Sequence, residues 1–163
     1  FVLAHKPNVV FADETTTGID VSRQKKVINQ FKLIQSENPD TTIIIISHDF
    51  AFLNHLVDTY VVMFGGFVLE VINDINKLRS RETLHPYTAD LLSSLDQSSN
   101  NIQKETIDNF IDLTIKPQGC PYKDRCKVFA SGDRELQHKC ESELPPIVDP
   151  YSGEKVEELN MEL

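Results

Sequence analysis

The first third of the chain alternates short apolar runs with a longer segment of helical periodicity. Residues 9–12 and 41–46 are rich in apolar and β-branched side chains and have the length of strands. Between them, residues 21–37 place apolar side chains three or four positions apart, which predicts an amphipathic helix. Asp20 is well placed to cap its first turn, and Asn38-Pro39-Asp40 to end it. This order predicts two buried parallel strands joined by a right-handed crossover helix.

The remainder of the chain continues with short elements and then loses apolar density. The expected elements are a helix over 50–57, strands over 60–64 and 67–71, and helices over 73–81 and 86–95. Gly65-Gly66 between the two strands is a strong hairpin signal. Residues 97–101 are a polar linker, and the segment beyond them is expected to be an irregular appendage. The pattern as a whole predicts the α/β class.

Polar side chains follow both predicted parallel strands at the point where each strand ends. Asp13 and Glu14 come directly after the first strand, and His48 follows the second. The carboxyl ends of parallel strands meet at one edge of a sheet, where ligands of open α/β sheets bind. A carboxylate pair with an imidazole there suits metal-assisted attack of water on a phosphate. The alternative is structural: a capping aspartate, a solvated glutamate and a turn histidine.

Composition narrows the possible partners. The chain has 163 residues, of which 40% are hydrophobic and 25% charged, so one domain, or one core with an appendage, is expected. The net charge of −9 argues against nucleic acid or an anionic membrane surface as the main partner. No run reaches the roughly 18 apolar residues of a membrane span. Residues 1–7 lack the features of a signal peptide and are expected to end a helix of a longer chain.

The motifs at the strand ends, taken in order, resemble the second half of the ATP-binding cassette of ABC transporters, a P-loop NTPase. The resemblance implies that Asp13 is the Walker B aspartate that supports Mg²⁺ and Glu14 the catalytic glutamate that polarises water. It also implies that His48 is the switch histidine that senses the γ-phosphate. Gly18-Ile19-Asp20 is similar to the D-loop, whose aspartate communicates across a dimer of cassettes. Phe64-Gly65-Gly66-Phe67-Val68 resembles the hairpin that follows in these domains.

The later motifs resemble one branch of that family, the ATPases of oligopeptide and dipeptide importers. The similarity rests on His85-Pro86-Tyr87-Thr88, on the segment from Gly119 to Cys126, and on Cys140 followed by Pro145-Pro146. Residues 1–84 are therefore expected to be the C-terminal part of a nucleotide-binding domain, and residues 85–163 the importer's C-terminal region. Thr15 replaces a usual proline after the carboxylate pair, which loosens that turn.

The resemblance implies a function that these residues cannot perform alone. It implies ATP and Mg²⁺, a second ATPase subunit (identical or paralogous), transmembrane permease subunits, and indirectly a peptide-binding protein. Location is expected to be peripheral, on the cytoplasmic face of the membrane. The sequence contains neither a Gly-x-x-x-x-Gly-Lys-Ser/Thr phosphate loop nor a Leu-Ser-Gly-Gly-Gln signature, so the isolated chain is expected to be inactive. The alternative is a non-catalytic regulatory module derived from a cassette. The transported peptides are not specified.

Three cysteines, Cys120, Cys126 and Cys140, all lie in the last third of the chain. They are either free thiols or ligands, since thiolates bind zinc and iron–sulfur clusters. Four cysteines are usual here in the importer family, and the resemblance implies a [4Fe-4S] cluster as one possibility. The fourth cysteine is missing, and His138 or a glutamate is the candidate replacement. His85-Pro86-Tyr87-Thr88 is interpreted as a packing and capping motif that joins the cassette to this tail.

Overall fold

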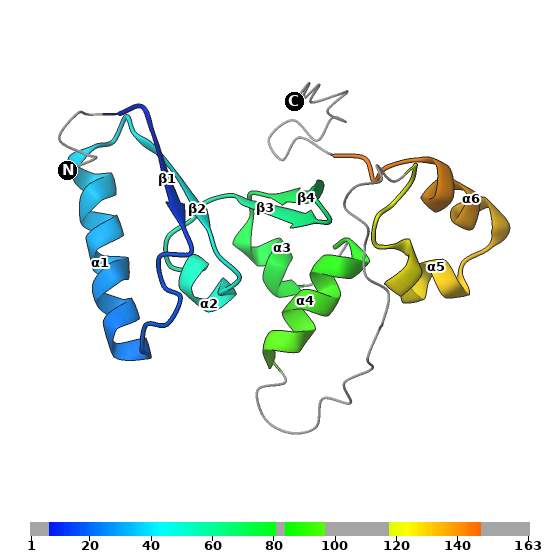
Figure 1. The fold of residues 1–163 in the computed structure, drawn as a ribbon, viewed down its shortest axis with the longest axis horizontal. Helices are drawn as coiled ribbons and strands as arrows, with labels where there is room; N and C mark the ends of the chain where they lie inside the picture. Colours follow the sequence, from blue (N-terminus) through cyan, green and yellow to red (C-terminus); the bar gives the residue numbers. More distant parts are fainter. Residues whose placement is uncertain (1–6, 81–83, 97–117, 148–163) are drawn as a thin grey trace. The chain divides into compact units, whose positions relative to one another are not determined.

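The computed structural model describes residues 7–80, 84–96 and 118–147, which fall into two compact units (Figure 1). The N-terminal unit is Phe1–Asp58 and the C-terminal unit is Thr59–Leu163. Both mix helices with a small two-stranded sheet, so the α/β character expected from the sequence is present in each.

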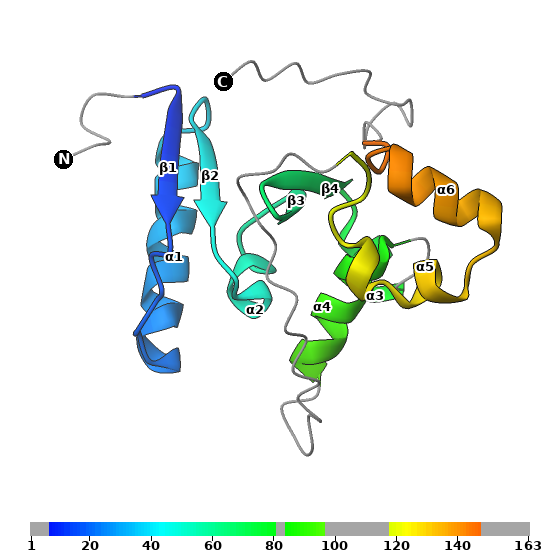
Figure 2. The same ribbon diagram turned by 45° about the vertical axis from the view of Figure 1, so that its right-hand side comes forward.

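The N-terminal unit is a β-α-β crossover followed by one short helix. Its elements are β1 (Val9–Asp13), α1 (Val21–Glu37), β2 (Thr42–Ile46) and α2 (Phe50–Leu53). β1 and β2 pair in parallel, with Val9 opposite Thr42 and Asp13 opposite Ile46. Figure 2 shows α1 running alongside the two strands that it connects. The predicted strand–helix–strand order is therefore confirmed.

Side chains define both ends of α1, as the sequence predicts. The Asp20 carboxylate accepts a hydrogen bond from the Arg23 backbone N–H at 2.9 Å, which caps the first turn. At the other end, both the backbone N–H and the side-chain amide of Asn38 donate to the Ile34 carbonyl, each at 3.0 Å. α2 is shorter than predicted, because Asn54, a weak helix former, follows it and residues 54–56 continue as turns.

The β1–β2 pair is covered on one face, not on both as the sequence predicted. Alternate residues on one face are exposed: Val9 (45%), Phe11 (69%), Ile44 (40%) and Ile46 (50%). The residues between them, such as the buried Ala12, are partly or fully covered. The strands alternate their side chains between two faces, and α1 supplies a single layer of cover within the described part of this unit.

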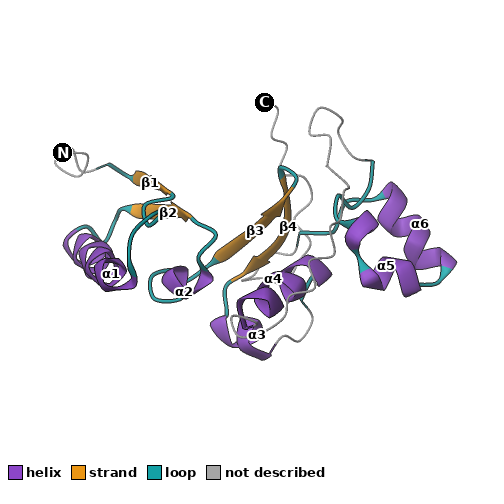
Figure 3. Cartoon of the chain, turned by 60° about the horizontal axis from the view of Figure 1, so that its bottom comes forward, coloured by secondary structure: helices purple, strands orange, loops and turns teal. Residues whose placement is uncertain are grey.

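The C-terminal unit begins with the predicted hairpin. β3 (Tyr60–Phe64) and β4 (Phe67–Ile72) pair antiparallel. Gly65 and Gly66 between them both have positive φ, 58° and 84°, which a two-residue type I′ turn requires and which glycine adopts without strain. Two helices follow, α3 (Ile75–Ser80) and α4 (Pro86–Asp96), and both lie on one side of the hairpin (Figure 3).

The tail is partly helical, so the prediction of an irregular appendage is wrong for residues 123–142. A 3₁₀ turn, η2 (Lys123–Arg125), precedes α5 (Lys127–Ser131) and α6 (Arg134–Ser142). The Cys126 sulfur accepts from Phe129 N–H and caps α5, and the Asp133 carboxylate accepts from Leu136 N–H and caps α6. These short helices depend on caps, so the low apolar density of the segment concealed them. The predicted linker and the rest of the predicted appendage lie outside the described residues.

An aromatic cluster forms the core of the C-terminal unit. Leu69, Cys120 and Tyr122 are buried together, and Phe64 and Tyr87 pack against them. The Phe64 ring centroid lies 4.7 Å from that of Tyr87 and 5.2 Å from that of Tyr122. These rings come from the hairpin, from α4 and from the cysteine-containing segment. The cluster therefore supports the interpretation of the His-Pro-Tyr-Thr motif as a packing element.

Close backbone contact fixes the start of the cysteine-containing segment. The Cys120 backbone N–H donates to the Cys140 carbonyl at 2.8 Å. Gly119 is buried beside it, and a Cβ at this position would clash with the Cys140 carbonyl oxygen. Glycine is therefore required before the first cysteine, because no other residue allows the two backbone stretches to approach so closely.

The Thr88 hydroxyl anchors α4 to the hairpin. Thr88 is fully buried, and its Oγ1 donates to Glu70 Oε2 on β4 at 2.6 Å. The His85 backbone N–H donates to the same oxygen at 3.1 Å. One carboxylate oxygen thus holds the first turn of α4 through two donors.

Replacing Thr88 by valine should destabilise the chain by about 1–3 kcal/mol, because the partly buried Glu70 Oε2 loses one of its two hydrogen-bond donors. Thr88→Ser retains the hydroxyl and loses one methyl group, so it should cost only about 1 kcal/mol. Urea unfolding followed by circular dichroism measures both. Equal stability of the two variants would show that the hydrogen bond contributes nothing.

Candidate functional site

Glu14 follows β1 in an uncommon backbone conformation. Its φ is 46°, in the left-handed region that few non-glycine residues occupy. Its N–H donates to the Ile46 carbonyl at 2.9 Å, which extends the β1–β2 ladder by one residue. Its carbonyl accepts from Thr17 N–H at 3.1 Å, which closes the turn after the strand. Hydrogen bonds on both sides of Glu14 therefore hold the residue in a conformation that it would not otherwise favour.

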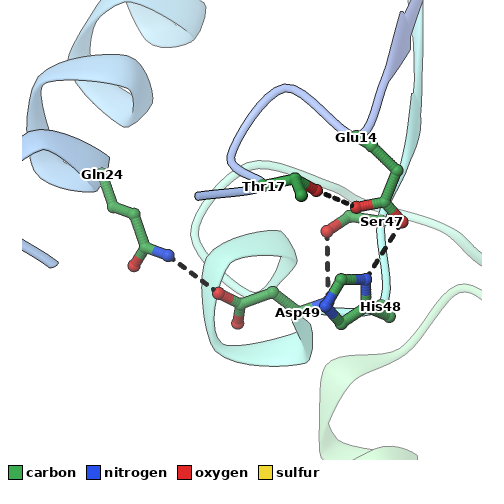
Figure 4. A network of polar contacts seen from close by, with 6 residues as sticks. All are labelled: Glu14, Thr17, Gln24, Ser47, His48 and Asp49. Carbon is green, nitrogen blue, oxygen red and sulfur yellow. Dashed lines mark hydrogen bonds and ion pairs between the residues drawn. The ribbon is translucent and has the colours of Figure 1, made fainter. Parts of the chain in front are cut away.

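Both carboxylate oxygens of Glu14 have partners (Figure 4). Oε1 lies 3.0 Å from His48 Nδ1, and Oε2 accepts from Thr17 Oγ1 at 2.7 Å. His48 comes from the loop after β2, and Thr17 from the turn after β1. The structure thus brings together two of the predicted site residues from the ends of neighbouring parallel strands, as the sequence predicts.

The His48 loop is shaped by its flanking residues. The Asp49 backbone N–H donates to Ser47 Oγ at 3.1 Å, and Asp49 Oδ1 accepts from Phe52 N–H at 3.0 Å to cap α2. Asp49 Oδ2 accepts from the side-chain amide of Gln24 at 3.1 Å. The backbone on either side of His48 is therefore fixed, while the imidazole itself stays accessible.

Electrostatics favour the charged forms of the pair. The hydrogen bond from Thr17, followed by that from His48, lowers the pKa of Glu14 below its ordinary value. The Glu14 carboxylate raises the pKa of His48. The His48 side chain is 80% exposed and that of Glu14 39%, so the surrounding water screens the ion pair and a ligand could reach both groups.

The other two predicted residues stand apart from this contact. Asp13, the last residue of β1, is exposed beside Glu14, and a carboxylate in that position can bind a hard cation. Asp20 instead contacts the first turn of α1: it accepts from Ser22 Oγ at 2.7 Å and pairs with Arg23 at 3.4 Å. These hydrogen bonds, first that from Ser22, lower the pKa of Asp20. Asp20 is therefore a helix cap in this chain.

Sequence reasoning missed Thr17 and Gln24. The Thr-rich turn after Glu14 was visible, but no pattern indicated which hydroxyl reaches the carboxylate. Gln24 lies on α1, and its partner Asp49 is 25 positions further along the chain. Neither contact has a signal in hydrophobic periodicity.

The cysteine hypothesis gains no support. Cys120, Cys126 and Cys140 are free and share the aromatic core, with Cys120 Sγ 3.8 Å from His85 Nε2. Burial raises the pKa of Cys120 and lowers that of His85, which favours the neutral form of each group. In the described part of the chain, no three His, Cys, Asp or Glu side chains are arranged to hold a metal ion. His138 is exposed on α6.

No described helix is both long and apolar enough to cross a membrane.

Comparison with known proteins points to one family. Residues 74–131 match the family described as "Oligopeptide/dipeptide transporter, C-terminal region". The dipeptide transport ATP-binding protein DppD of Bacillus subtilis is 34% identical over 123 residues, which is 74% of this chain and 36% of that protein. The oligopeptide transport ATP-binding protein AppD of B. subtilis is 32% identical over 165 residues, covering 94% of this chain and 44% of AppD.

A third relative, the oligopeptide transport ATP-binding protein OppF of Haemophilus influenzae, is 28% identical over 147 residues. That match covers 87% of this chain and 41% of OppF. The chain thus spans about two fifths of the length of the curated relatives that it matches.

The Glu14–His48 pair predicts a defined pH dependence. Because the pKa of His48 is raised, the contribution of the ion pair to folding stability is fully present below the ordinary histidine value of 6.5. It is lost as the pH rises through the raised pKa. The lowered pKa of Glu14 means that the contribution is present above 4.5 and is lost as the pH falls through the lowered pKa. The ion pair should therefore be complete between these values. An NMR titration of the His48 ring should give a pKa above 6.5.

Glu14→Gln should return the pKa of His48 toward 6.5, because the carboxylate that stabilises the imidazolium is gone. An unchanged His48 titration in Glu14→Gln would contradict the contact.

Proposed function

Because the chain is homologous to the ATP-binding proteins of oligopeptide and dipeptide ABC transporters, we propose that it forms part of a subunit that hydrolyses ATP to drive peptide import. The observation that carries this proposal is the Glu14–His48 contact at 3.0 Å between the ends of two parallel strands. A carboxylate and an imidazole thus lie side by side at the sheet edge where ligands of open α/β sheets bind, which supports a general-base role for Glu14. The relatives are transport ATP-binding proteins, which supports ATP as the substrate of this site.

Glu14 is proposed to orient and polarise the attacking water. Its lowered pKa keeps the carboxylate ionised at neutral pH, so it can accept a proton or a hydrogen bond from water. Thr17 and His48 each engage one oxygen and leave the remaining lone pairs for water. The left-handed backbone conformation of Glu14 also helps to orient the water, because it fixes the direction in which the carboxylate projects from the end of the strand.

His48 is proposed to contact the terminal phosphoryl group. With Nδ1–H donating to Glu14, the Nε2 atom of a neutral ring is an acceptor and cannot bind a phosphate oxygen. A protonated ring donates from both nitrogens. The raised pKa of His48 therefore favours the form that can hold Glu14 and the γ-phosphate together.

Asp13 would hold Mg²⁺, since a carboxylate beside the water-activating residue suits a hard cation. When bound, the metal would neutralise charge on the phosphate oxygens. Asp20, at the start of α1, is proposed as the D-loop residue that communicates with a second cassette. We include no metal or cluster at Cys120, Cys126 and Cys140, because their arrangement does not favour one.

Residues 1–84 would belong to the nucleotide-binding domain and residues 85–163 to the importer-specific region. The complete subunit would supply the phosphate loop and the signature motif, would pair with an identical or paralogous ATPase, and would bind permease subunits at the cytoplasmic face of the membrane. A peptide-binding protein would deliver the substrate to that complex. The alternative, a non-catalytic regulatory module, has no support among the relatives described above, which are transport ATP-binding proteins.

In the complete subunit, Glu14→Gln should lower ATP turnover by about 100-fold or more while ATP binding persists, because glutamine cannot act as a base. His48→Ala should also lower turnover strongly. The matched control is Glu37→Gln, the same substitution at the exposed end of α1, which should leave turnover unchanged. Phosphate release measures turnover, and equilibrium binding of ATP measures affinity. Near-normal turnover in Glu14→Gln would contradict the assignment.

The isolated 163 residues provide a further sample for the same assay. They are expected to show no turnover, because they contain no phosphate loop to grip the β- and γ-phosphates. Magnesium-dependent hydrolysis by this chain alone would overturn that part of the proposal.

A further inference from the structure

A side-chain hydrogen bond connects the His48 loop to α1. Gln24 Nε2 donates to Asp49 Oδ2 at 3.1 Å, across 25 positions of sequence, and the contact is partly buried (Figure 4). It joins the first turns of α1 to the residue directly after His48. None of the chemical roles proposed above uses Gln24.

Asp49 transmits this contact to the loop backbone. Its Oδ1 accepts from Phe52 N–H and caps α2, while its backbone N–H donates to Ser47 Oγ. With Oδ2 held by Gln24, the carboxylate is fixed at both oxygens. The rotation of Asp49 about its backbone is therefore restricted, and with it the direction in which the preceding residue, His48, projects.

His48 depends on such support because its own ring has little. The imidazole is 80% exposed, and its contact with Glu14 joins two side chains that are both open to water. An exposed ring with one hydrogen bond does not hold its orientation by packing. Its placement must come from the backbone of residues 47–49.

We propose that Gln24 is a positioning residue for ATP hydrolysis: through Asp49 it fixes the loop that holds His48 against Glu14. This inference rests on the proposed ATPase function. Gln24 lies in the first turns of the helix that Asp20 caps, so the bond also ties that helix start to the His48 loop.

The polarity of the bond allows a swap experiment in the complete subunit. Gln24→Leu keeps the approximate shape of the side chain and removes the hydrogen-bond donor. It should lower kcat by about 10-fold and leave the affinity for ATP unchanged, because a misplaced His48 affects the geometry of the reaction and not the binding of ATP in the ground state. Gln24→Glu places one carboxylate against another and should lower kcat at least as much.

Combining Gln24→Glu with Asp49→Asn should restore most of kcat. The introduced amide can still cap α2 through its oxygen while its NH₂ group donates to the new carboxylate.

Matched controls are available on the same helix. Gln30 is exposed on α1, so Gln30→Leu and Gln30→Glu make the same chemical changes away from Asp49 and should leave kcat unchanged. Thermal melting of each variant checks folding. If Gln24→Leu does not fold, the recovery of kcat in the Gln24→Glu/Asp49→Asn pair decides the question.

A double-mutant cycle separates positioning from general structural support. If Gln24 acts through His48, then Gln24→Leu should lower kcat in the native background and have no further effect in the His48→Ala background. An equal loss in both backgrounds, or no recovery in the swap, would overturn the inference. If Gln24→Leu has a normal kcat while Glu14→Gln is inactive, the positioning role of Gln24 is rejected and the proposed ATPase site stands. An active Glu14→Gln would reject the proposed ATPase site itself.

Discussion

The arrangement of the candidate site depends on the register of two parallel strands. Asp13 stands opposite Ile46, and the next residue, Glu14, donates its backbone N–H to the Ile46 carbonyl. This pairing brings the residue after β1 beside the loop after β2, so Glu14 and His48 meet although 34 positions separate them. A slip of one residue would reverse the face on which each side chain lies and separate the two groups. The backbone therefore sets the distance, and Thr17 and Asp49 refine the orientations.

In the C-terminal unit, the His-Pro-Tyr-Thr motif and the cysteine-containing segment contribute packing and hydrogen bonds to the core. Thr88 and the His85 backbone share one oxygen of Glu70, and the Tyr87 ring packs against those of Phe64 and Tyr122. These contacts explain why a His-Pro-Tyr-Thr motif and a glycine-preceded cysteine occur in the same unit. The motif starts α4 and supplies one ring, while Gly119 admits the backbone approach that buries Cys120.

The sequence predicted the features that have local causes. The Asp20 cap, the full length of α1 and the Gly65-Gly66 hairpin each follow from a short stretch of residues, and all are present. The meeting of Glu14 and His48 was also predictable, because parallel strands end at one edge of a sheet. Thr17 and Gln24 were not predictable, since their contacts depend on side-chain rotamers and, for Gln24, on a distant partner. The α6 helix was not predicted because its segment has few apolar residues and depends on the Asp133 cap. The metal hypothesis gains no support from the described residues, because the spacing of cysteines does not determine how their sulfur atoms converge.

The ends of β1 and β2 are proposed to form the water- and metal-binding half of an ATPase site. A structure of the complete subunit carrying Glu14→Gln, determined with ATP and Mg²⁺, tests this proposal most directly. The predicted result has Mg²⁺ at Asp13, the side chain at position 14 within hydrogen-bond distance of a water in line with the γ-phosphate, and His48 Nε2 on a γ-phosphate oxygen. ATP bound with its γ-phosphate away from these three residues would contradict the account.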